Sequence, residues 1–167
     1  LSSDNYQAYL TKVSPTGLVP VLVDGQTIVH DSLAIAEYLN EYADGRLYPL
    51  DKNKRAIARS LCSELHAGFS TIKAKCPFSL NAVSSMTNID DAFDSELARI
   101  QHIFAQAKKP FMFEQPGIVD AFFAVMAYRL TSYGIKLEGE AGQYQSELMQ
   151  WSLLESAIQS SKLWKTL

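Results

Sequence analysis

Residues 18–42 change their hydrophobic pattern at Asp31, and this change limits the possible folds more than any other feature of the sequence. Two short runs rich in β-branched residues, 18–23 and 27–30, flank the dipeptide Asp24-Gly25, which is typical of a β-hairpin with a tight turn. From Asp31 onward, apolar residues recur at helical spacing to the end of the segment. The pattern therefore predicts a hairpin that runs directly into a helix.

The rest of the chain has mainly helical patterns. Ser3 or Asp4 can cap a short first helix, and Asp51 can cap a long helix that ends before Pro77. Between these helices, the turn-forming residues within 44–49 predict a boundary between two domains. The predicted helices are 4–12, 31–42, 52–75, 89–107, 118–133 and at least one within 144–160.

These patterns predict an α+β protein in two parts. Residues 1–44 form a small domain that contains the hairpin, 45–51 form a linker, and 52–167 form an all-helical domain. The helix at 118–133 is apolar nearly all round, which is typical of the central helix of a bundle.

The composition excludes several classes of protein. With 47% hydrophobic and 20% charged residues, a chain of 167 residues can bury a core. A net charge of −3 offers no basic surface for nucleic acid, and the cations within 52–59 have the spacing of a solvated helix face. No apolar run is long enough for a membrane span or a signal peptide, so we expect a soluble cytoplasmic protein. Cys62 and Cys76 have neither CxxC nor Cys/His ligand spacing, and no metal is expected.

The string SPTGLVPVLVDG, followed by IVHDSLAIAEYLNEYADGRLYP, resembles the second half of the thioredoxin-like domain of cytosolic glutathione transferases. That family has a fixed order of elements in this region. A Val-Pro corner is followed by a hairpin, then by an acid-Ser pair at the start of a helix, and then by a linker to an all-helical domain. The corresponding positions here are Val19-Pro20 and Asp31-Ser32. The string RAIARSLCSELHAGF is closest to a bacterial subgroup of the family.

A second segment strengthens the resemblance. The string PGIVDAFFA, 116–124, resembles the family's S/T-I-x-D segment at the start of the central bundle helix, with Asp120 in a capping position. Gly117 stands where Ser or Thr is usual, so only half of a capping box remains. We expect Asp120 to be a structural cap whose replacement by Ala costs about 0.5–2 kcal/mol of stability.

The resemblance implies a glutathione site with two parts, one that binds the glutathione backbone and one that binds its γ-glutamyl end. The peptide bond between Val19 and Pro20 is expected to be cis, which turns the main chain of Val19 toward the cysteinyl unit of glutathione. Ser32, in the first turn of a helix, is expected to bind the γ-glutamyl carboxylate, and Asp31 the γ-glutamyl ammonium group. Asp31 and Ser32 also suit plain helix capping, and this alternative stays open.

The family also has a second-substrate pocket beside the helix that starts near Lys52. His66, Phe69 and Tyr128 are the candidates for this pocket in the present chain. A lone helix histidine is more often packed or on the surface, and aromatic residues at helical spacing are more often core. Both alternatives therefore stay open for these residues.

The implied function is that of a homodimeric glutathione transferase, which adds the glutathione thiolate to a small electrophile. One alternative is a glutathione-dependent isomerase of the maleylacetoacetate isomerase type, with glutathione as its cofactor, and another is a non-catalytic binding or assembly module. In the family, the Ser, Tyr or Cys that activates the thiol follows a strand that would precede Leu1. No catalytic residue is therefore assigned in this chain, which we expect to be a fragment.

Overall fold

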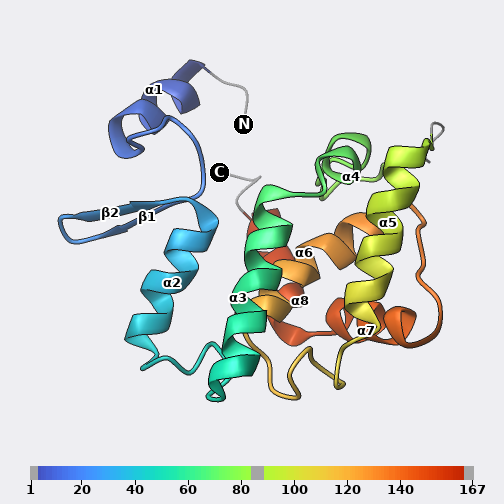
Figure 1. Cartoon of the computed structure of the whole chain (residues 1–167). Coiled ribbons are helices and arrows are strands. Elements are labelled where there is room, and N and C mark those ends of the chain that lie inside the picture. Colours follow the sequence, from blue (N-terminus) through green and yellow to red (C-terminus); the bar gives the residue numbers. More distant parts are fainter. Residues whose placement is uncertain (1–3, 84–88, 164–167) are drawn as a thin grey trace. The chain divides into compact units, whose positions relative to one another are not determined.

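The computed structural model describes residues 4–83 and 89–163, and the chain divides into two compact units, Leu1–Leu47 and Tyr48–Leu167 (Figure 1). Each unit is described by itself below. The predicted fold class is confirmed: two strands and helices of a partial thioredoxin-like region precede a helical domain.

The first unit contains the predicted hairpin and the helix that follows it. Its elements are α1 (Asp4–Val13), β1 (Val21–Asp24), β2 (Thr27–His30) and α2 (Ser32–Tyr42). The strands are antiparallel, with Val21 opposite His30 and Asp24 opposite Thr27, and α2 packs against both strands.

The first strand is shorter than predicted, because β1 begins at Val21 and not at Leu18. The Ser14 hydroxyl forms hydrogen bonds with both main-chain groups of Leu18. It accepts from the Leu18 N–H at 3.2 Å and donates to the Leu18 carbonyl at 2.8 Å. Pro20 has no N–H to donate to a ladder. The ladder with β2 therefore starts only after Pro20.

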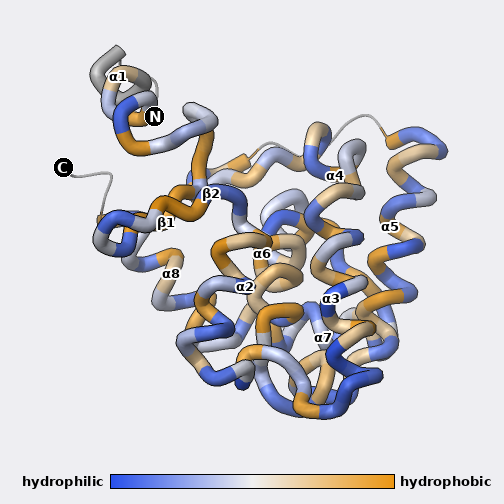
Figure 2. Tube along the Cα trace, turned by 60° about the vertical axis from the view of Figure 1, so that its left-hand side comes forward, coloured by the Kyte–Doolittle hydropathy of each residue, from blue (hydrophilic) through white to orange (hydrophobic). Residues whose placement is uncertain are grey.

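The second unit consists of six helices within the described residues. They are α3 (Lys52–Ala67), α4 (Ser70–Lys75), α5 (Asp91–Phe104), α6 (Ile118–Ser132), α7 (Gly139–Met149) and α8 (Ser152–Leu163). The central helix is α6, which buries eight residues and packs against α3, α7 and α8. Figure 2 shows its apolar stretch in orange. The ring of Phe104 meets Phe123 and Tyr144 edge-on, at centroid distances of 5.5 and 5.0 Å.

The predicted long helix at 52–75 is wrong as a single element, because α3 ends at Ala67 and α4 begins at Ser70. Gly68 has an extended backbone, and Phe69 is left-handed with φ 58° and a buried side chain. Charged side chains form hydrogen bonds with main-chain groups at the two helix ends that flank this break. Glu96 accepts from the N–H groups of Thr71 and Ile72, and Lys73 donates to the Leu65 carbonyl.

Other helix ends also differ from the prediction. Asp90 caps α5 by accepting from Phe93 N–H, so this helix begins at Asp91 and not at Ile89. The C-terminal region holds two helices, and the first starts at Gly139, before the predicted 144. The described helices include none that is long and apolar enough to cross a membrane.

Candidate functional site

The register of the hairpin brings the two predicted halves of the glutathione site together. The last ladder pair is Val21 with His30. Pro20 and Asp31 each lie one residue beyond this pair, and Val19 and Ser32 each lie two residues beyond it. The Val-Pro corner and the start of α2 therefore lie at the same open end of the hairpin.

Val19 presents its main chain at this end. The Val19-Pro20 peptide bond is cis, and the Val19 residue is 58% exposed. Neither its N–H nor its carbonyl bonds to any residue that the structure describes. Unpaired main-chain groups at the end of a strand can bind an extended peptide by continuing the ladder. Val19 can therefore act as a ligand through its backbone.

Asp31 links β2 to α2 in an unusual backbone conformation, with φ 77° and ψ 132°. A positive φ is unfavourable for a residue with a side chain, and such residues cluster at ligand sites. Its Oδ1 accepts from the N–H groups of Leu33 at 2.8 Å and Ala34 at 3.3 Å. Asp31 is therefore the cap of α2, and a role in binding an ammonium group remains a prediction.

Ser32 occupies the first position of α2 and is half-buried. Asp31 bonds the next two amides, whereas the N–H and the hydroxyl of Ser32 make no hydrogen bond with any described residue. The start of a helix carries a partial positive charge, which favours a carboxylate there. The geometry thus leaves two donors of one residue available for an anion.

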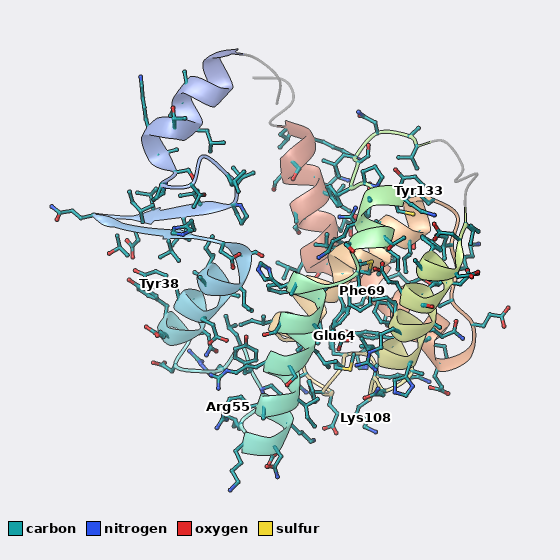
Figure 3. All side chains as sticks on the ribbon, turned by 45° about the horizontal axis from the view of Figure 1, so that its top comes forward. Tyr38, Arg55, Glu64, Phe69, Lys108 and Tyr133 are labelled. Atoms are coloured by element: carbon teal, nitrogen blue, oxygen red, sulfur yellow. The ribbon has the colours of Figure 1, made fainter. Side chains whose placement is uncertain are left out.

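The candidates for a second-substrate pocket have different surroundings. Phe69 is only 6% exposed and belongs to the core of the helical unit (Figure 3). Tyr128 is half-buried on α6, and its ring lies 5.3 Å from that of Phe78. His66 is exposed in the last turn of α3, where its carbonyl accepts from the Lys73 ammonium group. Their role in a pocket remains a prediction.

Asp120 is buried in the first turn of α6, and its carboxylate accepts three hydrogen bonds. Its Oδ2 accepts from Gly117 N–H at 2.9 Å, and its Oδ1 accepts from Met112 N–H at 2.8 Å and the Tyr144 hydroxyl at 2.6 Å. Burial raises the pKa of the Asp120 carboxyl, and the Tyr144 hydrogen bond opposes this rise. The Gly117 bond was visible as half of a capping box, whereas Met112 and Tyr144 gave no sequence signal.

Known proteins that are similar to this chain include glutathione transferases. Residues 2–42 match the glutathione S-transferase N-terminal domain. Glutathione S-transferase Z1 of Arabidopsis thaliana is 43% identical over 58 residues, which cover 34% of this chain and 26% of that protein. A stringent starvation protein A homolog of Pasteurella multocida is 27% identical over 131 residues, covering 78% of this chain and 60% of that protein.

A third relative is a probable maleylacetoacetate isomerase of Vibrio cholerae, 35% identical over 68 residues, which cover 38% of this chain and 32% of that protein. In each of these three relatives, the matched region spans less than two thirds of the relative's length.

Among solved structures, a glutathione transferase homolog from Burkholderia GL BGR1 with bound glutathione has a TM-score of 0.69 and 21% identity. The match covers 92% of this chain and 77% of that one. The fold is therefore the glutathione transferase fold. Residues 2–42 thus resemble the N-terminal domain of glutathione S-transferases, and the chain has the fold of these proteins.

Proposed function

We propose that the protein is a glutathione transferase that holds glutathione at Val19, Pro20, Asp31 and Ser32 and adds its thiolate to a small electrophile. The observation that carries this proposal is the hairpin register, which brings Val19 and Ser32 to the same end of the hairpin, where the main chain of Val19 and the donors of Ser32 bond to no described residue. The family match at residues 2–42 and the glutathione bound to the Burkholderia homolog support it.

Each part of the site matches one part of glutathione, an extended anionic tripeptide. The Val19 N–H and carbonyl pair with the main chain of the cysteinyl unit, as a neighbouring strand would. The Ser32 N–H and hydroxyl bind the γ-glutamyl carboxylate at the positive end of α2. The Asp31 carboxylate is the counter-charge for the γ-glutamyl ammonium group.

None of these residues activates the thiol. The reactive form is the thiolate, so a transferase needs a group that lowers the thiol pKa and positions the sulfur. The site residues proposed here supply binding and orientation. The thiol-activating group is not assigned to any residue of this chain.

Two alternatives to a transferase stay open. The similarity to a probable maleylacetoacetate isomerase favours a glutathione-dependent isomerase, in which glutathione is a cofactor and is regenerated. A binding or assembly module of the same fold also stays open, and the similarity to a stringent starvation protein A homolog extends over 78% of the chain. A homodimer and a cytoplasmic location remain predictions.

Calorimetric titration of the intact protein with glutathione tests the proposal. Both enzyme functions require measurable heat at millimolar glutathione, and the assembly module does not. Turnover of a chlorinated aromatic compound would favour the transferase, and turnover of a cis-enedioic acid would favour the isomerase. An absence of heat at millimolar ligand would contradict both enzyme functions.

A further inference from the structure

A polar cluster fastens the far end of the hairpin to α2. The Oδ2 atom of Asp24 accepts a hydrogen bond from the Tyr42 hydroxyl at 2.7 Å and another from the Tyr38 hydroxyl at 3.0 Å. The two hydroxyls are 3.1 Å apart, and the ring centroids are 5.1 Å apart. We call Asp24, Tyr38 and Tyr42 the hairpin clamp; Tyr38 is labelled on α2 in Figure 3.

The clamp lies at the opposite end of the hairpin and helix from the proposed glutathione site. Asp24 is the last residue of β1, whereas Pro20 precedes its first residue. The strand from Pro20 to Asp24 is about 13 Å long at about 3.3 Å per residue. The helix from Ser32 to Tyr42 is about 15 Å long at about 1.5 Å per residue. Because these lengths are similar, the side chains of the clamp can contact one another at one end of the hairpin and helix while the glutathione site lies at the other end.

Few buried side chains help to fix the angle between α2 and the hairpin. The side chains described in the first unit include only three that are buried, Leu10, Ser14 and Asn40, and only Asn40 belongs to α2. Its Oδ1 accepts from Leu47 N–H, beyond the end of α2, and bonds neither strand. At the site end, Asp31 joins β2 to α2 without an intervening loop. The helix is therefore held to the hairpin covalently at Asp31, by the packing of half-buried side chains against both strands, and by the hydrogen bonds of the clamp at the far end.

We propose that Asp24, Tyr38 and Tyr42 are positioning residues for glutathione, because their hydrogen bonds set the direction of α2 and thus the place of Ser32 relative to Val19. This inference rests on the proposed function. Loss of the clamp lets α2 pivot about Asp31, so the Ser32 donors and the Val19 main chain no longer meet the two ends of one ligand. The clamp itself touches no ligand.

The test uses the intact protein as wild type, as the double variant Tyr38→Phe/Tyr42→Phe and as Tyr9→Phe. Tyr9 is a matched control, because it is exposed in the same unit and its hydroxyl bonds to no described residue. Each protein is titrated calorimetrically with glutathione and with cysteinylglycine, which lacks the γ-glutamyl unit. The number of sites reports the folded fraction, and Kd reports the geometry of the folded site.

We expect the double variant to keep the wild-type number of sites and to bind glutathione about fivefold or more weakly. Its Kd for cysteinylglycine should change less, because this ligand does not bridge the two halves of the site. Tyr9→Phe should bind both ligands as the wild type does. Asp24→Asn keeps an acceptor for the phenols, so it should restore most of the affinity that Asp24→Ala loses.

Three results would overturn the inference. An unchanged glutathione Kd in the double variant shows that the clamp does not position the site. A lower number of sites at an unchanged Kd shows a purely structural role. If the wild type binds no glutathione, both the proposed function and this inference are wrong. Faster amide exchange at Leu33 in the double variant would then show separately that the clamp holds the start of α2.

Discussion

The hydroxyl of Tyr144 on α7 donates a 2.6 Å hydrogen bond to the buried carboxylate of Asp120 on α6. Tyr144 is fully buried, and Asp120 is only 1% exposed. The same carboxylate accepts from two main-chain N–H groups, so it joins α7 and the loop before α6 to the first turn of the central helix. Asp120 is thus more than a helix cap.

Replacing Asp120 with Ala should therefore cost more than the 0.5–2 kcal/mol typical of a lost cap. Two buried donors and the half-buried N–H of Gly117 lose their acceptor together, and we expect a loss of about 3 kcal/mol or more in the free energy of unfolding. Tyr144→Phe leaves the two main-chain bonds in place and should cost about 1–2 kcal/mol. Urea denaturation measures both variants. Equal midpoints for Asp120→Ala and Tyr144→Phe would show that the main-chain bonds contribute nothing.

Gly142 in α7 should not tolerate Ala, although Ala favours helices. A Cβ at Gly142 would overlap the Leu137 main-chain carbonyl oxygen, much closer than van der Waals contact allows. We expect Gly142→Ala to destabilise the protein by about 2–3 kcal/mol. Gly134→Ala is the matched control: its φ is +75° with no atom within 4 Å, so it should cost only about 1 kcal/mol. Thermal unfolding of both variants tests which substitution is the more destabilising. A Gly134→Ala variant less stable than Gly142→Ala would contradict this explanation.

Glu96 of α5 replaces the missing cap of α4. Phe69 precedes α4 and cannot cap it with a side-chain oxygen, whereas the Glu96 carboxylate accepts from Thr71 and Ile72 N–H at 3.1 and 2.8 Å. Glu96→Ala should cost about 1 kcal/mol, and Glu96→Gln less, because the amide keeps one acceptor. Hydrogen exchange at the Ile72 amide should quicken in Glu96→Ala. An unchanged exchange rate there would mean that α4 does not need this bond.

The ion pair between Glu64 and Arg99 should make stability depend on pH in the acid range. Arg99 of α5 donates to both carboxylate oxygens of Glu64 on α3, at 2.6 and 2.8 Å, and these hydrogen bonds lower the pKa of Glu64. The unfolded chain thus takes up this proton at higher pH than the folded protein does. The stabilisation is complete above the unfolded pKa, near 4.5, and is lost as pH falls through the folded value.

Arg99→Met keeps much of the apolar side chain and removes the charge. Because the pair is partly exposed, its contribution at pH 7 should be modest, about 0.5–1 kcal/mol. The difference in urea midpoint between wild type and Arg99→Met should shrink below pH 4. A difference that stays constant from pH 7 to pH 3 would exclude the ion pair as its source.

The hairpin and the helix after it could be predicted because their signals are local. The Asp24-Gly25 turn, the β-branched runs and the change of period at Asp31 all act within one short segment. That Val19 and Ser32 lie at the same end of the hairpin follows from the hairpin register, which the turn fixes. The central helix could also be predicted, since it is apolar on nearly every face.

The break at Gly68 could not be predicted from the same signals. An isolated glycine within a helical pattern is usually tolerated, so periodicity alone favoured one helix. What allows the break is tertiary: Glu96 and Lys73 bond the exposed helix ends, and the side chain of Phe69 is buried. The partners of Asp120 on α7 and in the preceding loop, and the phenols that meet Asp24, are long-range contacts of the same kind.

The central claim is that Ser32 and Val19 together recognise the γ-glutamyl end and the backbone of glutathione. It is tested most directly by titrating the intact wild type and Ser32→Ala with glutathione and with its isomer in which glutamate is linked through the α-carboxyl group. We predict that the wild type prefers glutathione by about tenfold or more, and that Ser32→Ala loses most of this preference while unfolding at a similar urea concentration. Equal affinity of the wild type for the two isomers, or an undiminished preference in Ser32→Ala, would contradict the claim.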